Sequence, residues 1–306
     1  MSTKVSRVAL CAAAVATVVG MTGCSAHTAK KTAEGVAKVA VQPLAALQRA
    51  MDSTEKYGSA EVRMTTSFPA HSTIVGSSSE NEPITMEGTY SWGDGLSFDV
   101  QTDAKSTGLD GLTSGKSVNM LLVNGAYYYH VVPRASGQLK GKHWVRVDLS
   151  AVVGESGAAA LTGGSDDPTQ GLKSLKYTRN VRRVGKETVL GRETTHYHAT
   201  LSKDDLGAAG SALGSDDKKR LLQQFPGSVD SITFDVWVDN HDMPVRMKED
   251  LDSMKVLVDF KKFGPAKPVQ TPSASDTADL SDTLRQMQTR PPGQMDTSGQ
   301  TAPLMR

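Results

Sequence analysis

Cysteine is almost absent from this chain of 306 residues, which contains only Cys11 and Cys24. Cys11 lies in an apolar stretch near the N-terminus. Removal of that stretch would leave a single thiol, so no internal disulfide could form. A fold stapled by disulfides is therefore excluded, and Cys24 calls for another explanation.

Long hydrophobic runs are also missing, since a membrane span needs about 20 apolar residues. The apolar run 8–19 follows two basic residues and indicates a secretory signal. The signal ends in Met21-Thr22-Gly23-Cys24, which resembles a bacterial lipobox, although its first two residues depart from the usual Leu and Ala or Ser. By that resemblance residues 1–23 are cleaved off, and the sulfur of Cys24 carries a palmitate-type diacylglyceryl anchor. An ordinary secretory signal with an incidental cysteine is the alternative.

The chain lacks a strong charge of either sign, because 34 basic and 33 acidic residues leave a formal net charge of +1. Loss of Lys4 and Arg7 with the signal would make it −1. This balance gives no electrostatic case for a nucleic-acid partner or for attraction to an anionic membrane. We therefore expect the lipid on Cys24 to hold the protein on the extracytoplasmic face of the cell membrane.

Motifs of catalysis and metal binding are missing as well. The chain has no G-x-S-x-G elbow, phosphate-binding glycine loop or paired catalytic carboxylates. His196 and His198 share one strand face but lack a third ligand, and Asp235, Asp239 and Asp242 do not match a calcium loop. We predict no enzyme activity, cofactor or metal; a hydrolase of envelope polymers is the weakest alternative.

What the chain does contain is alternating apolar and polar residues, most clearly over 232–264. This stretch predicts three antiparallel strands, a β-meander, with turns at 239–242 and 252–253. Asn124-Gly125 lies between two further alternating runs and is a strong hairpin signal. Pro43 and Gly58 delimit an apolar stripe at helical spacing, so we expect a helix of about four turns.

Together these patterns predict an α+β fold with a strongly curved, mainly antiparallel half-barrel of about ten or eleven strands. Helices should cover its concave face. The expected organisation is a signal peptide over 1–23, a lipidated tether over 24–42, the half-barrel domain over 43–264 and a disordered tail over 265–306. Within the domain, the Gly-rich segment 154–171 is expected to be mobile, and 216–225 to be helical.

In these features the sequence resembles actinobacterial lipoproteins of the LppX/LprG type, which are similar in architecture to the LolA/LolB carriers. The resemblance covers roughly residues 40–264. It is carried by the order of several weak motifs, namely the lipobox, the helix at Pro43 and the runs 125–128, 141–148, 189–197, 236–239 and 244–246. It implies an eleven-stranded half-barrel capped by helices that holds the acyl chains of a lipid or lipoprotein, without catalytic residues.

Eleven apolar residues on the predicted strands are candidates for lining such a cavity. They are Leu96, Phe98, Val100, Met120, Leu122, Tyr197, Leu201, Phe234, Val236, Val258 and Phe260. For each of them taken alone, a place in a dry core is the favoured interpretation. The case for a cavity is collective, because aromatic content is only 5% and the predicted helices are few and broken by glycine.

The function expected from these observations is binding, and transport, of an acylated lipid by a membrane-anchored lipoprotein. A membrane transporter or another envelope protein would be a further partner. The alternative is a non-enzymatic sensor or protein-interaction lipoprotein of the same fold.

Overall fold

The structure of the chain is a computed structural model that describes residues 26–68, 82–93, 95–151, 154, 168–178, 180–208, 229–251, 254–265 and 267–289. The predicted signal peptide, Cys24 and the helix expected over 216–225 lie outside the described residues, as does most of the Gly-rich segment. Residues 40–306 form one compact unit, and the preceding residues form another.

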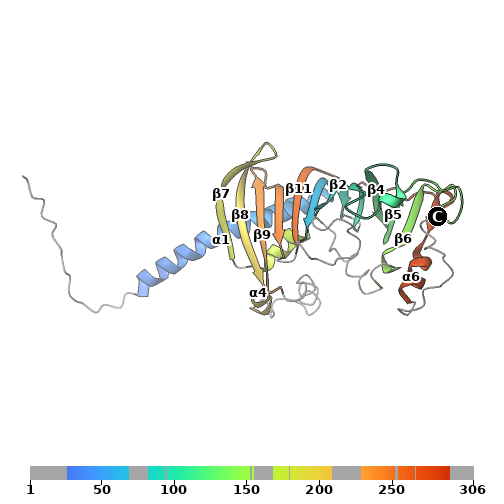
Figure 1. Cartoon of the computed structure of the whole chain (residues 1–306). Helices are drawn as coiled ribbons and strands as arrows, with labels where there is room; N and C mark the ends of the chain where they lie inside the picture. The colour runs from blue at the N-terminus through green and yellow to red at the C-terminus, as the bar shows by residue number, and fades with distance from the viewer. Residues whose placement is uncertain are drawn as a thin grey trace, which may run out of the picture. The chain divides into compact units, whose positions relative to one another are not determined.

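The described chain is dominated by one curved, unclosed sheet of twelve strands (Figure 1). Its strands are β1 (Ser59–Ser67), β2 (Ile84–Ser91), β3 (Ser97–Asp103), β4 (Ser117–Val123), β5 (Ala126–His130), β6 (Trp144–Asp148), β7 (Asn180–Val189), β8 (Arg192–Ser202), β9 (Ser231–Asp239), β10 (Pro244–Asp250), β11 (Lys255–Gly264) and β12 (Thr277–Asp279). They run in the order β12-β6-β5-β4-β3-β2-β1-β11-β10-β9-β8-β7. Only the β12–β6 pair is parallel. The predicted fold class is confirmed, with β7 and β12 as the two open edges.

The predicted β-meander is confirmed as β9, β10 and β11, with Pro244 at the start of its middle strand. Asn124 and Gly125 both have positive φ and connect β4 to β5 as expected. Strand β7 contains a bulge between Arg183 and Gly185, which adds a residue without ending the strand.

Helices are few in the described residues. They are α1 (Ala26–Tyr57), α3 (Gln170–Ser174), α4 (Lys203–Ala208) and α6 (Ser281–Thr289), with 3₁₀ turns η1 (Asp110–Leu112), η3 (Leu175–Tyr177) and η4 (Ala274–Asp276). The expected helix start at Pro43 is wrong, because α1 begins at Ala26 and Pro43 lies inside it. Proline removes one backbone hydrogen bond, and here that loss does not end the helix. The predicted tether is thus helical from residue 26 onward.

The two faces of the sheet are covered differently. The face that we call the inner face packs against α1 and α3 in one large apolar cluster, which includes Leu47 of α1 and Leu172 of α3. The opposite, outer face is mostly polar. Its exception is a small cluster on β4 and β5, where Leu121 and Tyr128 contact Val269 from the chain that follows β11.

Gly88 in the middle of β2 allows the sheet to bend. A Cβ atom at this position would overlap the carbonyl oxygen of Asp99 on β3 and lie 2.8 Å from the Cα of Val100. Backbones that approach this closely are possible only beside glycine, which often marks a sharp bend in a strand.

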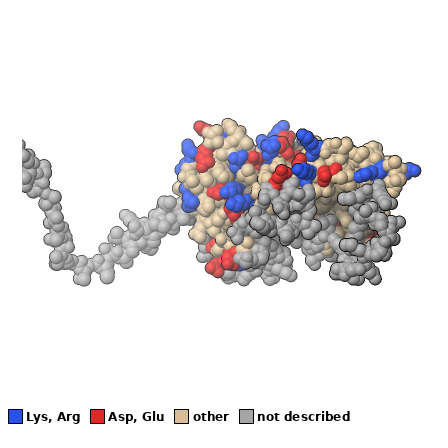
Figure 2. Space-filling model, in the orientation of Figure 1, with Lys and Arg blue, Asp and Glu red and all other residues tan. Residues whose placement is uncertain are grey.

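The two edges of the sheet are formed by β7 and β12. At the end where Figure 1 places β7, Figure 2 shows Lys and Arg side chains interspersed with Asp and Glu. At the other edge, the short strand β12 pairs with β6, and α6 follows it directly.

The expectation that residues 265–306 are disordered is wrong for 267–289. This segment contains η4, β12 and α6, and it buries Ala278 and Leu280 in a cluster with Val145 and Val147 of β6. Composition suggested disorder because the tail has few large apolar residues. Among the described residues of the tail, Val269, Ala278, Leu280 and Leu284 pack in clusters with the sheet. The domain therefore extends beyond residue 264.

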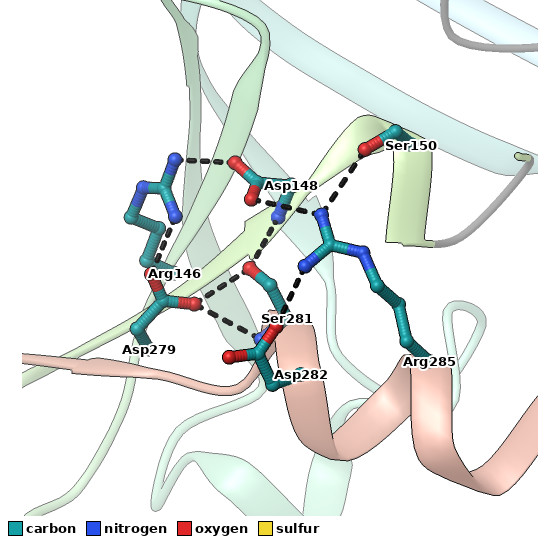
Figure 3. Close-up of polar contacts among 7 residues, drawn as sticks. All are labelled: Arg146, Asp148, Ser150, Asp279, Ser281, Asp282 and Arg285. Atoms are coloured by element: carbon teal, nitrogen blue, oxygen red, sulfur yellow. Dashed lines mark hydrogen bonds and ion pairs between the residues drawn. The ribbon is translucent and has the colours of Figure 1, made fainter. Parts of the chain in front are cut away.

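Charged side chains fasten this C-terminal segment to β6 (Figure 3). Arg146 of β6 pairs with Asp148 and, at 2.5 Å, with Asp279 of β12. The Asp279 carboxylate accepts hydrogen bonds from the backbone N–H and the hydroxyl of Ser281. Arg285 of α6 then reaches back to Asp148 at 3.2 Å. The segment is thus held by a connected network and not by one isolated pair.

Candidate functional site: the inner apolar face

The eleven residues predicted to line a cavity all belong to the inner apolar cluster. Nine of them are buried members of the cluster, while Leu96 and Tyr197 are half-buried and pack against it. They come from β3, β4, β8, β9 and β11, together with Leu96 just before β3. The sequence therefore placed these residues on one face correctly. Their role as a ligand lining stays a prediction.

Strand register explains why they meet. Phe98 and Val100 of β3 stand opposite Leu122 and Met120 of β4. On the other half of the sheet, Tyr197 of β8 stands opposite Val236 of β9. Residues directly opposite each other in adjacent strands point to the same face. Alternation along each strand and pairing between strands thus produce one continuous apolar surface.

Helical segments cover part of this surface. Leu47 and Ala50 of α1 are fully buried against it, as are Leu172 of α3 and Leu175 of η3. Figure 1 shows α1 crossing behind the strands. The helix stripe predicted from the sequence therefore finds the partner it was expected to have, a sheet face.

Around the buried residues lies a set of inner-face hydrophobic side chains that stay only half-buried. It is rich in methionine and aromatic residues and includes Met51, Met64, Met86, Met254, Tyr127, Tyr129 and Tyr177. Methionine adapts its shape and is frequent at surfaces that accept varied apolar partners. The sequence analysis did not single these residues out. The alternation of β1 and β5 could have revealed Met64, Tyr127 and Tyr129.

Glu249 is the residue that sequence reasoning missed most clearly. It alternates with Val245 and Met247 along β10 and stands opposite Phe234 and Val256, so its carboxyl group lies on the apolar face. Burial raises its pKa from 4.5 to about 7, because a low-dielectric environment disfavours the charged form. The side chain is half-buried and retains some accessible surface.

The carboxyl group of Glu249 also contacts the helical cover. A Cβ atom added to Gly171 of α3 would overlap Oε1 of Glu249. A larger residue at this position would require the end of the Glu249 side chain to move. Tyr129, on the same face at β5, has its pKa raised to about 12 by burial. Two ionisable groups far apart on the inner face thus both experience a medium that disfavours charge.

The histidines considered as metal ligands have other partners. Nδ1 of His196 lies 2.8 Å from Oε1 of Glu187, and its Nε2 lies 2.8 Å from Oδ1 of Asp235. Nδ1 of His198 lies 3.0 Å from the same Asp235 oxygen. The ring of His196 also stacks on Trp237, with centroids 4.3 Å apart. This network lies on the outer face and links β7, β8 and β9.

The network lowers the pKa values of its acids. Hydrogen bonds from Trp237 and then from His196 lower the pKa of Glu187. For Asp235, burial acts to raise the pKa, and the hydrogen bonds from His198 and His196 outweigh it, so the pKa is lowered. Among the described residues, no group of three or more His, Cys, Asp or Glu residues is arranged to hold a metal ion.

The acidic residues considered for calcium are engaged locally. Asp239 accepts hydrogen bonds from the backbone N–H groups of His241 and Met243, which shape the β9–β10 turn. Asp242 pairs with Arg49 of α1 at 2.9 Å.

In the described part of the chain, no helix has the length and hydrophobicity needed to span a bilayer.

Comparison with known proteins adds relatives of similar length. No protein-family model matches the chain. It is 29% identical to an uncharacterized 31.2 kDa protein of Streptomyces griseus, over 80% of this chain and 81% of that one. It is 26% identical to a Streptomyces coelicolor protein named "Putative lipoprotein", over 87% of this chain and 85% of the relative.

Solved structures similar to the chain include two mycobacterial lipoproteins. LppX of Mycobacterium tuberculosis is 17% identical with a TM-score of 0.46, over 76% of this chain and 98% of that one. LprF of Mycobacterium bovis is 12% identical with a TM-score of 0.42, over 76% and 96% respectively. LppX is also the type of lipoprotein that the sequence resembles. The fold itself is established by the strand pairing described above.

Proposed function

We propose that the protein is a membrane-anchored lipoprotein of the cell envelope whose inner apolar face binds the acyl chains of a lipid. The observation that carries the binding role is the set of half-buried methionine and aromatic side chains around the inner cluster. An apolar surface that stays partly accessible under a helical cover favours an apolar ligand. The eleven sequence-predicted residues would form the floor beneath that ligand.

The anchor in this proposal is the diacylglyceryl group on Cys24. It is supported by the lipobox-like residues 21–24 and by the name of the Streptomyces coelicolor relative. We place the domain on the extracytoplasmic face, because a secretory signal precedes it. The further partner would be a membrane transporter or another envelope protein that delivers or receives the lipid.

Energetics determine what such a carrier can do. Each methylene moved from water onto the inner face contributes about 0.8 kcal/mol, which is roughly a fourfold change in Kd. Moving the same methylene from a bilayer gains almost nothing, because the bilayer interior is equally apolar. The protein would therefore exchange lipid with a membrane without an energy source, and it would not drive net transport by itself.

The test uses the chain from residue 24 onward with Cys24→Ser, which keeps every described residue and removes the anchor. Mass spectrometry of organic extracts should find co-purified lipid. Fluorescent fatty acids of increasing chain length should bind more tightly, by about fourfold per methylene until the apolar surface is covered. An affinity that does not change with chain length would contradict the proposal.

A variant pair localises the binding. Leu96→Trp adds a bulky ring at a half-buried position that packs against the inner cluster, so it should displace part of an acyl chain and weaken binding. Val132→Trp adds the same ring at a position that is 42% exposed and should leave binding unchanged. Equal effects of the two substitutions, or protein free of lipid that binds no fatty acid, would favour a sensor or interaction role.

A further inference from the structure

The edge strand β7 combines exposed cations with an exposed apolar side chain. Arg182, Arg183 and Lys186 are all exposed and form no ion pair with any described residue. Val184 between them is 46% exposed. The acid on the same strand, Glu187, is already held by His196 and Trp237. The strand itself therefore carries three cations and one acid.

The cations lie on both sides of the sheet edge. Arg182 stands opposite His198, which belongs to the outer face, while Arg183 stands opposite Tyr197, which belongs to the inner face. The bulge between Arg183 and Gly185 leaves Val184 without a partner on β8. Figure 2 shows basic and acidic groups together at this end of the sheet.

The hairpin that follows β7 exposes a leucine in a strained conformation. Leu190 has a φ of 50° and is 49% exposed. The equivalent position of the β4–β5 hairpin holds Asn124 with a φ of 53°, and asparagine is a residue that tolerates this region. A bulky side chain at such a position is a backbone outlier of the kind that clusters at functional sites.

Protection of the sheet edge explains only part of this pattern. Charged residues and a bulge on an edge strand also prevent pairing with another sheet. Val184 and Leu190 work against that purpose, because they add exposed apolar surface to the same edge. Basic residues interleaved with exposed apolar side chains are instead typical of surfaces that bind the interface of an anionic bilayer.

We propose that the edge from Arg182 to Leu190 docks the protein onto an anionic bilayer. The three cations face the headgroups, and Val184 and Leu190 reach the boundary of the acyl chains. At about 3.3 Å per residue the contact is roughly 27 Å long. Apart from Glu187, the acid beside it is the exposed Glu193 of β8. This docking goes beyond the proposed function, since it needs no ligand on the inner face.

The overall charge concealed this surface. A chain that is nearly neutral gives no general attraction to anionic lipids, yet β7 gathers cations along one edge. That edge pairs with β8, which carries Tyr197 on the inner face. A lipid that leaves the bilayer at β7 would meet Tyr197 first among the residues predicted to line the site.

The test is flotation of the anchor-free chain, with Cys24→Ser, on vesicles of phosphatidylcholine with or without phosphatidylglycerol. Wild type should float with the anionic vesicles and release at high salt. Changing Arg182, Arg183 and Lys186 together to Gln should weaken binding on the order of a hundredfold, since each cation contributes about fivefold. The control changes the exposed Lys116, Lys140 and Lys262 to Gln, which alters the net charge equally.

Leu190→Asn tests the apolar contribution without risk of unfolding, because asparagine suits the conformation at this turn. It should leave the domain as stable as wild type or more so, and weaken vesicle binding by about tenfold. Val184→Ser should act in the same direction.

Three outcomes would overturn the proposal. The first is wild type that floats with neither vesicle, as expected if the cations meet an acidic protein instead. The second is a β7 variant that binds as well as wild type. The third is a control that loses as much binding as the β7 variant, which would assign the effect to net charge alone. Fatty-acid binding without vesicles tests the proposed function separately.

Discussion

Glu249 provides the sharpest prediction, because a carboxyl group on an apolar face makes stability depend on pH in an unusual direction. Its pKa is about 7 in the folded chain against an ordinary value of 4.5. Between these two values the folded state holds a proton that the unfolded state has released. Stability contributed by the neutral group is therefore fully present below pH 4.5 and is lost as pH rises to about 7.

The magnitude follows from the shift. One pKa unit corresponds to about 1.4 kcal/mol, so a rise from 4.5 to about 7 amounts to about 3 kcal/mol of stability lost between acid and neutral pH. Among the described residues, no hydrogen-bond or ion-pair partner of this carboxyl group offsets the cost. Glu249→Gln keeps the shape of the side chain and removes the charge. The variant should be more stable than wild type at pH 8, by about 3 kcal/mol, and similar to it at pH 5.

Urea unfolding of the anchor-free chain at pH 5 and pH 8, monitored by circular dichroism, measures both proteins. The quantity that matters is the change with pH in the difference between variant and wild type, since other titrating groups cancel in it. Glu55→Gln, at an exposed site on α1, is the matched control and should shift neither value. If the difference between Glu249→Gln and wild type is the same at both pH values, the carboxyl group is not desolvated and the reasoning is wrong.

Three other predictions concern the fold. Gly88→Ala should cost about 2 kcal/mol or more in urea unfolding, because its Cβ would overlap a carbonyl of β3, whereas Gly111→Ala, which meets nothing within 4 Å, should be neutral. Arg146→Gln should speed amide hydrogen exchange in β12 and α6 while leaving β9 to β11 protected; uniform exchange across the domain would argue against a separable C-terminal segment. Burial acts to raise the pKa of the Asp279 carboxyl group, but hydrogen bonds from Ser281 and Arg146 outweigh it, so the pKa lies below its ordinary value of 3.8. The segment should therefore loosen as pH falls below about 3.8, and Asp279→Asn should show this faster exchange already at neutral pH.

Much of the fold could be predicted because the alternation that indicates a strand involves only residues close together in the sequence. The alternation over 232–264 contains both the period and the polarity of β9, β10 and β11, and Asn124-Gly125 specifies its own turn. The same alternation placed Phe98, Phe234 and Phe260 on one face. No long-range information was needed for these conclusions.

Other features could not be predicted, since they depend on what lies opposite. Glu249 reads as an ordinary solvent-facing acid until β9, β11 and α3 are seen to enclose it. The composition of segment 267–289 indicates disorder. Four of its apolar side chains nevertheless pack against the sheet and hold the segment in place.

The sequence by itself determined which residues alternate, where the chain turns and that its charge is balanced, because each of these depends on near neighbours along the backbone. Tertiary structure alone decided that β7 and β12 become the open edges, and therefore that the three neighbouring cations of β7 lie along an unpaired edge. Pairing between distant strands sets burial and local charge density. Those two quantities, and not composition, control where a bilayer or a lipid can bind.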